Sequence, residues 1–461
     1  YKKMKRYLSL DLLRGLSIFG MVFSAIIPFG VLPAWMYHIQ NPPPSHAFNP
    51  LVSGISWVDL VFPIFIFCMG AAIPMAGNRR IQNGTKAYVI EVFERFLMLW
   101  LFSYLYVILN FNQAEGWLPH LFTIAGYLAL FPLFVVIKTK FKEKILIRIA
   151  GVAMVSALII MGSILFKEEI SIYRSGIIIF LLAFLYLFGA LIWYFTRDNL
   201  KARAVIFFII LLFFAATVPF DLQPKLYAIK EIRWFVNLEY FYFLLILIPA
   251  TYIGDILQKR LASPEGYEPM KGAEKPLLVV TLCGITIVWE MVALYNGWLA
   301  ANFIVSVILG ALLLLSVKKY IPAYRQIVLP AIVLLLAGLI SLLIEGSISK
   351  SPCTASYCFI TTSISILLLV IIDYKVQFKD YPFIGLILRI FSGAGSNPLM
   401  SYITFGNLVM PFMQLTGLIV VYQAAYPEGY PWIGVARACL AVLLTMSLVA
   451  LMSEKKIYWR A

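Results

Sequence analysis

The stretch from Trp35 to Gly70 reads WMYHIQNPPPSHAFNPLVSGISWVDLVFPIFIFCMG and joins a polar, proline-rich loop to a long apolar run. The loop holds His38 and His46, two of the chain's three histidines, and the run carries Asp59 near its start. An apolar run of about 20 residues is long enough to cross the hydrocarbon core of a bilayer. The stretch therefore predicts a membrane-spanning helix entered from a polar loop, and we expect the chemistry of the protein in that loop.

The rest of the chain has the composition of a membrane protein. Of its 461 residues, 62% are hydrophobic and 13% are charged, whereas charged residues make up about 25% of ordinary globular domains. We therefore expect an all-α polytopic membrane protein, a single helical bundle of about 11–14 transmembrane helices that forms one integral domain over residues 1–461. The apolar runs lie at 9–32, 56–76, 88–109, 117–137, 145–166, 175–195, 203–219, 240–258, 276–295, 299–317, 326–345, 355–373, 396–421 and 431–452.

The basic residues indicate how the chain is oriented. When the runs are taken to cross the membrane alternately, most of the 37 Lys and Arg residues fall on one side. Arg437 lies inside a run, and the exceptions on the other side are Lys167, Arg174, Lys225, Lys230, Arg233 and Lys350. Because cytoplasmic loops hold the excess of Lys and Arg, this pattern predicts that both termini are cytoplasmic and that the histidines and Asp59 lie at the outer face. It also explains the net charge of +15 without a nucleic-acid partner.

His46 is the first candidate for catalysis. With an ordinary pKa near ~6.5, a histidine can accept and donate a proton at neutral pH. The prolines at 42–44 and 50 restrict how the loop returns to the helix, and a carboxylate such as Asp59 would orient the ring and stabilise its protonated form. The alternative is structural, because Ser56 and Asp59 fit a helix capping box in which Asp59 complements the helix dipole.

A second group of polar residues is expected at the inner face. Asp11 and Arg14 open the first run, and Arg79 and Arg80 follow the second. Asp11 and Arg14 either form an ion pair one helical turn apart, or Arg14 meets an anionic ligand such as a nucleotide phosphate. Asn397, which is followed by a proline, interrupts an apolar run near its inner end, and a broken helix of this kind can line a cavity.

A third group is expected at the outer face. Glu345, Lys350, Ser356 and Tyr357 surround one predicted loop, and Asn49 belongs to the histidine loop. A charged residue such as Glu345 at the end of a span either binds a substrate amine or hydroxyl or ends the helix. The sequence has no zinc-ligand spacing, no phosphate-binding glycine loop and no nucleophile elbow, so we expect no metal.

The five cysteines divide into two kinds. Cys68, Cys283 and Cys439 lie within apolar runs, where a free thiol behaves as a small packing residue. Cys353 and Cys358 share one outer segment and could form a disulfide if that face is oxidising. Their spacing at a helix entrance leaves this pairing open.

Several of these segments together resemble one family. In chain order they are Ser9-Leu10-Asp11-Leu12-Leu13-Arg14-Gly15, His46-Ala47, Val58-Asp59-Leu60-Val61-Phe62-Pro63, Phe67-Cys68-Met69-Gly70, Glu345-Gly346 with Lys350, Pro352 and Ser356-Tyr357, and Asn397-Pro398-Leu399 with Tyr402. They resemble the heparan-α-glucosaminide N-acetyltransferase family, and more closely its bacterial relatives within a wider group of transmembrane acyltransferases. The first-span and second-span motifs are the more specific ones.

The resemblance implies an acetyltransferase of the bacterial inner (cytoplasmic) membrane. Such an enzyme moves an acetyl group from cytosolic acetyl-CoA to an amino sugar or glycan on the far side. His46 matches the family's proposed catalytic histidine, and Asp59 matches the aspartate of its A-D-L-V-x-P motif. The family's H-A-x-W-N-G is His46-Ala47-Phe48-Asn49-Pro50 here, and Ser24 stands where an asparagine is expected in the first span. These departures lie on the acceptor side and bear on the sugar more than on the acyl chemistry.

The resulting hypothesis assigns a role to each group. His46, oriented by Asp59, would deprotonate the acceptor or carry the acetyl group itself. The residues expected to bind acetyl-CoA are Arg14, Asp11, Arg79, Arg80 and Asn397, and those expected to bind the acceptor are Asn49, Glu345, Lys350, Ser356 and Tyr357. The rival class is a glycan transporter or flippase, in which ionisable residues within the membrane mark a substrate path. Membrane lipids are expected partners, and the apolar outward faces fit a monomer or a homodimer.

Overall fold

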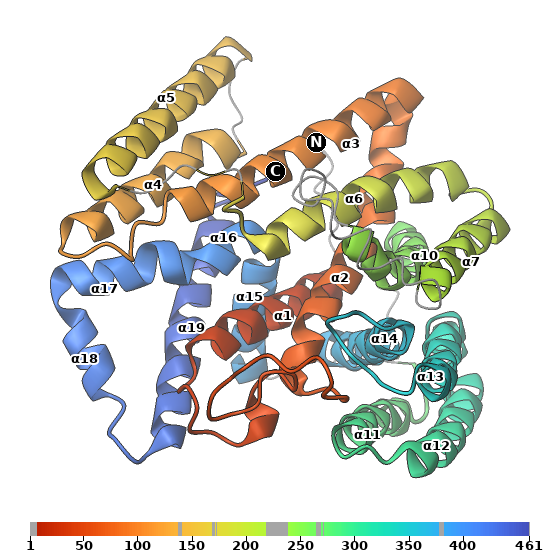
Figure 1. The fold of residues 1–461 in the computed structure, drawn as a ribbon. Helices are drawn as coiled ribbons and strands as arrows, with labels where there is room; N and C mark the ends of the chain where they lie inside the picture. Colours follow the sequence, from red (N-terminus) through yellow and green to blue (C-terminus); the bar gives the residue numbers. More distant parts are fainter. Residues whose placement is uncertain are drawn as a thin grey trace. The chain divides into compact units, whose positions relative to one another are not determined.

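The regular secondary structure in the part of the chain that the structure describes is helical (Figure 1). The computed structural model describes residues 7–136, 141–167, 171, 173–217, 238–263, 269–270, 272–377 and 382–460. The side chains of Arg79, Asn83, Phe141, Leu238, Glu239 and residues 382–384 lie outside this description. Within the described ranges there is no strand, and extended pairing is limited to an isolated bridge between Val135 and Trp459. The all-α prediction is confirmed.

Packing divides the chain into two compact units, each assembled from segments that are distant in the sequence. Unit 1 comprises Tyr1–Ser17, Phe29–Ile90 and Leu185–Leu388, and unit 2 comprises Ile18–Pro28, Glu91–Phe184 and Arg389–Ala461. The expectation of one integral domain over the whole chain remains a prediction.

The helices are distributed over both units. Unit 1 contains α2 (Trp57–Arg80), α7 (Leu200–Thr217), α10 (Leu244–Ala262), α11 (Pro276–Tyr295), α12 (Leu299–Tyr320), α13 (Arg325–Glu345) and α14 (Ala355–Gln377). Unit 2 contains α4 (Leu118–Phe134), α5 (Phe141–Phe166), α16 (Pro398–Thr404), the π-helix η5 (Phe405–Val409), α17 (Met410–Thr416), α18 (Leu418–Ala424) and α19 (Pro431–Glu454). Four helices contribute residues to both units, namely α1 (Leu8–Ile26), α3 (Thr85–Ile108), α6 (Ile177–Thr196) and α15 (Pro382–Gly395).

Eleven of the described helices are long and apolar enough to cross a membrane. A twelfth span is counted if Pro398–Thr416 and Leu418–Ala424, which meet at a bend of 101°, are taken together. The chain is therefore a multi-pass membrane protein, and the number of spans falls within the expected range. Two of the expected spans are not in this set: α3 carries Glu91, Glu94 and Arg95, and α4 has 17 residues, fewer than the about 20 that a bilayer core requires.

Unit 1 is built around α14. Of the residues in the membrane-length window of α14, 89% are buried, and the helix packs against α13, α11, α2 and α10. Beside it, α2 and α10 lie in close contact because glycines face the partner backbone. A Cβ atom added at Gly70 would lie 2.7 Å from Leu247 O. Small residues allow membrane helices to approach closely in this way, and α2 and α10 both pack in turn against α14.

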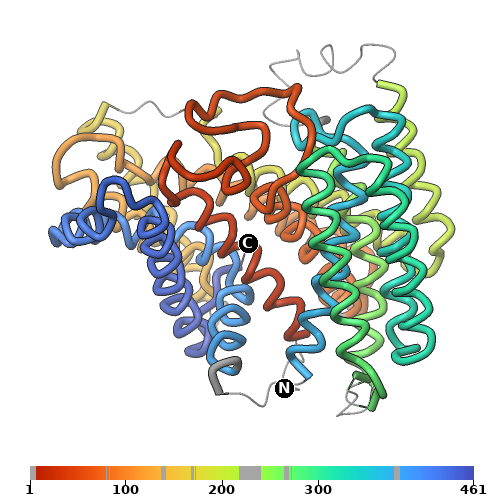
Figure 2. The backbone as a smooth tube through the Cα atoms, turned by 90° about the horizontal axis from the view of Figure 1, so that it is seen from below, coloured from red at the N-terminus to blue at the C-terminus, as the bar shows by residue number. Residues whose placement is uncertain are grey.

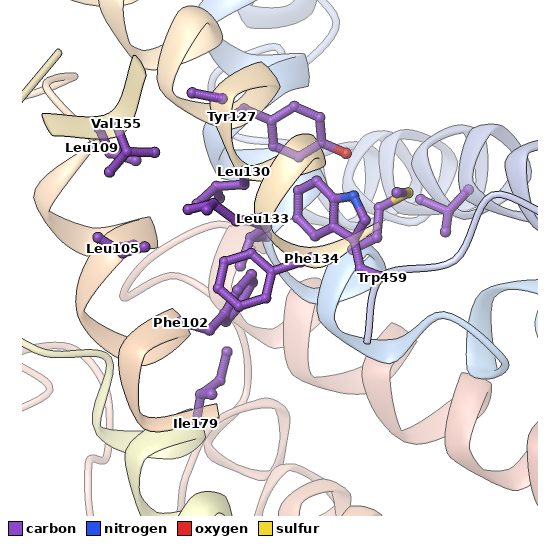
Figure 3. Packing of buried hydrophobic residues seen from close by; sticks show 14 residues of the cluster. Phe102, Leu105, Leu109, Tyr127, Leu130, Leu133, Phe134, Val155, Ile179 and Trp459 are labelled. Carbon is purple, nitrogen blue, oxygen red and sulfur yellow. The ribbon is translucent and has the colours of Figure 1, made fainter. Parts of the chain in front are cut away.

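Unit 2 has an aromatic core that includes the end of the chain. Trp459 is 2% exposed and packs against the rings of Phe102 and Tyr127 (Figure 3). It also packs against the ring of Phe131. These rings come from α3, α4 and the C-terminal tail, so the tail is part of the fold of this unit. Aromatic side chains bury a large area and favour the edge-to-face arrangements seen here.

Candidate functional site

The loop between α1 and α2 is folded back on itself (Figure 2). The His46 N–H donates to Pro42 O (3.1 Å), and the Asn49 N–H donates to Gln40 O (2.8 Å). Proline has no N–H to donate, so the donors of these two bonds are residues that follow the proline run, and the acceptors lie at its start or before it. The loop is thus an ordered structure, and its fold decides which histidine meets the carboxylate at the start of α2.

His46 packs within the loop. Its Nε2 accepts a hydrogen bond from the Gly30 N–H (3.0 Å), and its ring contacts the rings of Phe29 (centroids 4.0 Å apart) and Tyr37 (4.4 Å). Its φ of +52° lies in the left-handed region, which non-glycine residues adopt at a cost. These contacts are those of a side chain that holds the two ends of the loop together.

Asp59 pairs with the other histidine of the loop. His38 Nδ1 lies 2.7 Å from Asp59 Oδ1. Asp59 Oδ2 accepts from the Ile39 N–H (3.2 Å) and from the N–H and hydroxyl of Ser56 (3.0 Å each). The predicted pairing of His46 with Asp59 is therefore wrong, because the loop presents His38 to the helix start and turns His46 toward Gly30. The structural alternative, a capping box formed by Ser56 and Asp59, is confirmed.

The pairing gives His38 the arrangement of a general base. Since Nδ1 faces the carboxylate, the hydrogen-bond network assigns the ring proton to Nδ1 and leaves the Nε2 lone pair available. The His38 side chain is 39% exposed, whereas that of Asp59 is 3% exposed. A buried carboxylate that orients a partly exposed imidazole is the geometry in which histidine removes a proton from a substrate.

A second loop, between α13 and α14, is joined to the histidine loop. Gln40 Nε2 donates to Ser349 Oγ (2.9 Å) and Ser351 O (2.7 Å), and Gln40 Oε1 accepts from the Ser351 N–H (3.1 Å). The Gly54 N–H donates to Ile348 O (3.0 Å). These bonds bring together segments about 300 residues apart in sequence and set the second loop beside His38 and Asp59.

The second loop brings Lys350 and Tyr357 to the same place. The Tyr357 hydroxyl donates to the backbone carbonyl of Asp59 (2.6 Å) and is fully buried. Burial lowers the pKa of the Lys350 ammonium, and the negative charge of Asp59 partly opposes this effect. We define the candidate site as His38, Asp59, Lys350 and Tyr357, which lie at the starts of α2 and α14 and on the two loops before them.

The sequence model of a family described as a domain of unknown function, DUF5009, matches residues 6–257. This match covers more than half of the chain. The chain belongs to the DUF5009 family. A comparison with curated proteins found no match. The DUF5009 region includes His38 and Asp59 and ends before Lys350 and Tyr357, so the candidate site combines residues from within and beyond it.

The other residues expected at the acceptor side of this DUF5009 protein have local roles. The Glu345 carboxylate accepts from the N–H groups of Ala355 (2.8 Å) and Ser356 (3.1 Å) and so caps the start of α14. Glu345 is also the last residue of α13, which agrees with the alternative that it ends the helix. Ser356 is buried, and its hydroxyl donates to Thr354 Oγ1 (3.0 Å). Asn49 is exposed and accepts from the Leu51 N–H (3.0 Å), within its own turn.

The cysteines of the DUF5009 protein are free thiols. Cys353 Sγ and Cys358 Sγ are 3.5 Å apart and both side chains are buried, so the two thiols lie within hydrogen-bonding distance and form no disulfide. Cys68 and Cys283 are buried in α2 and α11, in agreement with a packing role. Among the described residues, no three His, Cys, Asp or Glu side chains gather as metal ligands.

Three of the residues expected to bind the cofactor, Asp11, Arg14 and Arg80, have partners within unit 1. Arg14 pairs with Asp11 (3.1 Å), and its second nitrogen donates to Cys68 O in α2 (3.4 Å). Arg80 donates to the Tyr186 hydroxyl (3.2 Å). Asp11 and Arg14 thus form the ion pair one helical turn apart that was the alternative to ligand binding. The side chain of Arg79 lies outside the described part.

Asn397 belongs to unit 2 and is fully buried. Its Nδ2 donates to Ile457 O (3.0 Å), and its Oδ1 accepts from the Trp459 N–H (3.1 Å). Both ends of the amide are therefore used to hold the C-terminal tail to the start of α16. This geometry does not support the expected contact of Asn397 with acetyl-CoA.

His38 is the residue that sequence reasoning missed. The family motif drew attention to His46, which precedes an alanine as the motif requires. The available signal was the presence of a second histidine in the same charge-free loop. His38 rather than His46 meets Asp59 because of how the loop folds against Ser349 and Ser351, and no local sequence pattern reveals that folding.

Proposed function

We propose that this protein is a membrane acyltransferase that moves an acetyl group from acetyl-CoA to an amino sugar or glycan across a bacterial inner membrane. The observation that carries the proposal is the His38–Asp59 pair, in which a buried carboxylate orients a partly exposed imidazole (2.7 Å). The resemblance of the first-span and second-span motifs to a family of transmembrane acetyltransferases supplies the reaction class. The many membrane-length helices fit a reaction whose two substrates approach from opposite sides.

In the proposed reaction, His38 Nε2 accepts a proton from the acceptor amine or hydroxyl as that group attacks the thioester carbonyl. A new carbon–nitrogen or carbon–oxygen bond forms, the carbon–sulfur bond breaks, and His38 returns the proton to the departing thiolate. Asp59 stabilises the intermediate imidazolium. Lys350 offsets the negative charge of Asp59, and Tyr357, through its bond to the Asp59 carbonyl, is a positioning residue.

A transfer assay with purified protein tests the proposal. The protein in detergent is incubated with radiolabelled acetyl-CoA and glucosamine, and the acetylated product is counted. The His38→Ala variant is expected to lose about 100-fold or more of the transfer rate, since general-base catalysis contributes this order of magnitude. His120→Ala is the matched control, because His120 is the third histidine of the chain and pairs with an amide, Asn112, instead of a carboxylate. Equal rates in wild type and His38→Ala would refute the assigned base.

The broken helix of unit 2 favours the rival function. Pro398–Thr416 and Leu418–Ala424 meet at a bend of 101°, and interrupted helices form substrate paths in many transporters. A transporter would move a fluorescent glycan or glycolipid across liposomes without acetyl-CoA, and it would neither bind nor consume acetyl-CoA. That outcome, with no acetylated product, would replace the enzyme by a flippase.

A further inference from the structure

The loop between α1 and α2 exposes large apolar side chains. Phe29 is 72% exposed, Phe48 54% and Leu51 88%, and Val31 and Trp35 are also exposed. We call these five residues the loop surface. Isolated exposed apolar residues are ordinary, but several on one short segment mark a contact with a partner or a membrane.

The same segment has no charged residue. Between Arg14 and Asp59 the sequence contains no Asp, Glu, Lys or Arg, whereas a segment in contact with water normally carries about one charge in four residues. The loop is therefore unlike a surface that faces water, although it lies outside the helices on either side.

The exposure is a property of an ordered loop. The Gly30 N–H donates to His46 Nε2, and one face of Phe29 is packed on the His46 ring. The Leu51 N–H is bonded to Asn49 Oδ1. These contacts hold the Phe29 ring and the backbone at Leu51, so the exposure of the surface belongs to the folded loop.

The flanking helices identify what covers this surface. Both α1 and α2 are membrane-length apolar helices, so the loop begins and ends at the surface of the bilayer. Tryptophan, phenylalanine and leucine are the side chains that enter the boundary between headgroups and acyl chains. We propose that the loop surface is inserted into this boundary region of the leaflet at the end of α1, with phospholipid as its partner.

The absence of Lys and Arg specifies the chemistry of the contact. Basic segments bind anionic lipids through charge, and their binding weakens with salt. This loop has only apolar groups to offer, so its insertion is independent of anionic lipid and of ionic strength. Its insertion holds whether or not the protein transfers acetyl groups, and it brings the neighbouring His38 close to the lipid headgroups.

Depth-dependent fluorescence quenching tests the insertion. Leu51→Cys and Phe48→Cys are made separately in a Cys439→Ser background, since Cys439 is the one native thiol that is not buried. Each is labelled with an environment-sensitive dye in nanodiscs that contain lipids spin-labelled near the headgroup or deep in the chain. Asp198→Cys, at an exposed charged position between α6 and α7, is the matched control.

The expected result is a blue-shifted emission at both loop positions and stronger quenching by the shallow spin label. The quenching should be equal in phosphatidylcholine and phosphatidylglycerol and unchanged by salt. Emission and quenching no different from those at Asp198→Cys would overturn the proposal. Blue-shifted emission without lipid quenching, together with dissociation of a dimer by Leu51→Asp, would also overturn it and assign the surface to a second copy of the chain.

Discussion

At the scale of single residues, Asp59 has two roles that the sequence presents as alternatives. One carboxylate oxygen accepts from the backbone and hydroxyl of Ser56 at the start of α2, and the other meets His38. The capping role follows from the local pattern, in which a Ser precedes an acid by three residues. The partner of the other oxygen depends on the folded loop, which is why the motif directed attention to His46.

Lys350 leads to a prediction about pH. Burial lowers the pKa of its ammonium below the ordinary 10.5, so the unfolded chain binds more protons than the folded chain between the lowered pKa and 10.5. The free energy of unfolding therefore rises with pH in this window. The Lys350→Met variant lacks this rise. The melting temperature of wild type, measured relative to Lys350→Met in detergent, should increase from about pH 7 to about pH 10. A difference that is constant or falls with pH would contradict the lowered pKa.

Gln40 is predicted to hold the two site loops together. Its amide makes three hydrogen bonds with Ser349 and Ser351 and is buried. Gln40→Ala should lower the free energy of unfolding by about 1–3 kcal/mol, since buried polar groups lose their partners. The more specific readout is limited proteolysis of the 346–354 loop, which should be faster in the variant. Asn49→Ala, at an exposed position of the same loop as Gln40, is the control and should leave proteolysis unchanged.

At the scale of elements, the α11–α12 hairpin shows what the hydropathy pattern can and cannot predict. Both helices and the tight turn at Gly297 agree with the expected runs. The pattern does not reveal that Glu290 is fully buried between them, where its carboxylate accepts from Asn302 Nδ2 (3.0 Å) and from the Ser306 hydroxyl. Glu290 lies in α11 and its two partners lie in α12, so the contact becomes visible only when the two helices are placed side by side.

The pairing predicts a non-additive response in the hairpin. Glu290→Leu leaves Asn302 and Ser306 unpartnered by the carboxylate and should destabilise the protein by about 1–3 kcal/mol. The combined Glu290→Leu, Asn302→Leu and Ser306→Ala variant removes both sides and should recover most of the loss. Thermal unfolding in one detergent measures both. If the losses of stability caused by Glu290→Leu, Asn302→Leu and Ser306→Ala simply add in the combined variant, the contact among the three side chains is not the cause of the loss.

At the scale of the whole molecule, composition and apolar run length predict more than local motifs do. The helical class, the multi-pass architecture and the range of spans follow from apolar runs of membrane length. His120 is expected at the outer face only if α3 and α4 both cross the membrane. These are the two expected spans that are not among the membrane-length helices, α3 because of its charged residues and α4 because of its length. Removing both leaves the predicted sides of the other segments unchanged, because two crossings cancel.

The predicted topology can be read by cysteine labelling in intact cells. Asn49→Cys and Asp198→Cys, each in the Cys439→Ser background, are predicted to lie on opposite sides of the membrane. Asn49→Cys is on the outer side if the N-terminus is cytoplasmic. A membrane-impermeant maleimide should then label Asn49→Cys in intact cells and Asp198→Cys only after permeabilisation. The reverse pattern would place the candidate site on the cytoplasmic side and remove the basis for transfer across the membrane.

The most direct test compares the two histidines of the loop in single-turnover acetyl transfer. The geometry predicts that His38→Ala loses about 100-fold or more of the rate and still folds, because Asp59 Oδ2 keeps its bonds from Ile39 and Ser56. His46→Ala should keep the chemical step and lower the melting temperature, because His46 holds Gly30 and Phe29. A folded His46→Ala variant without transfer, beside an active His38→Ala, would contradict the assignment of the site.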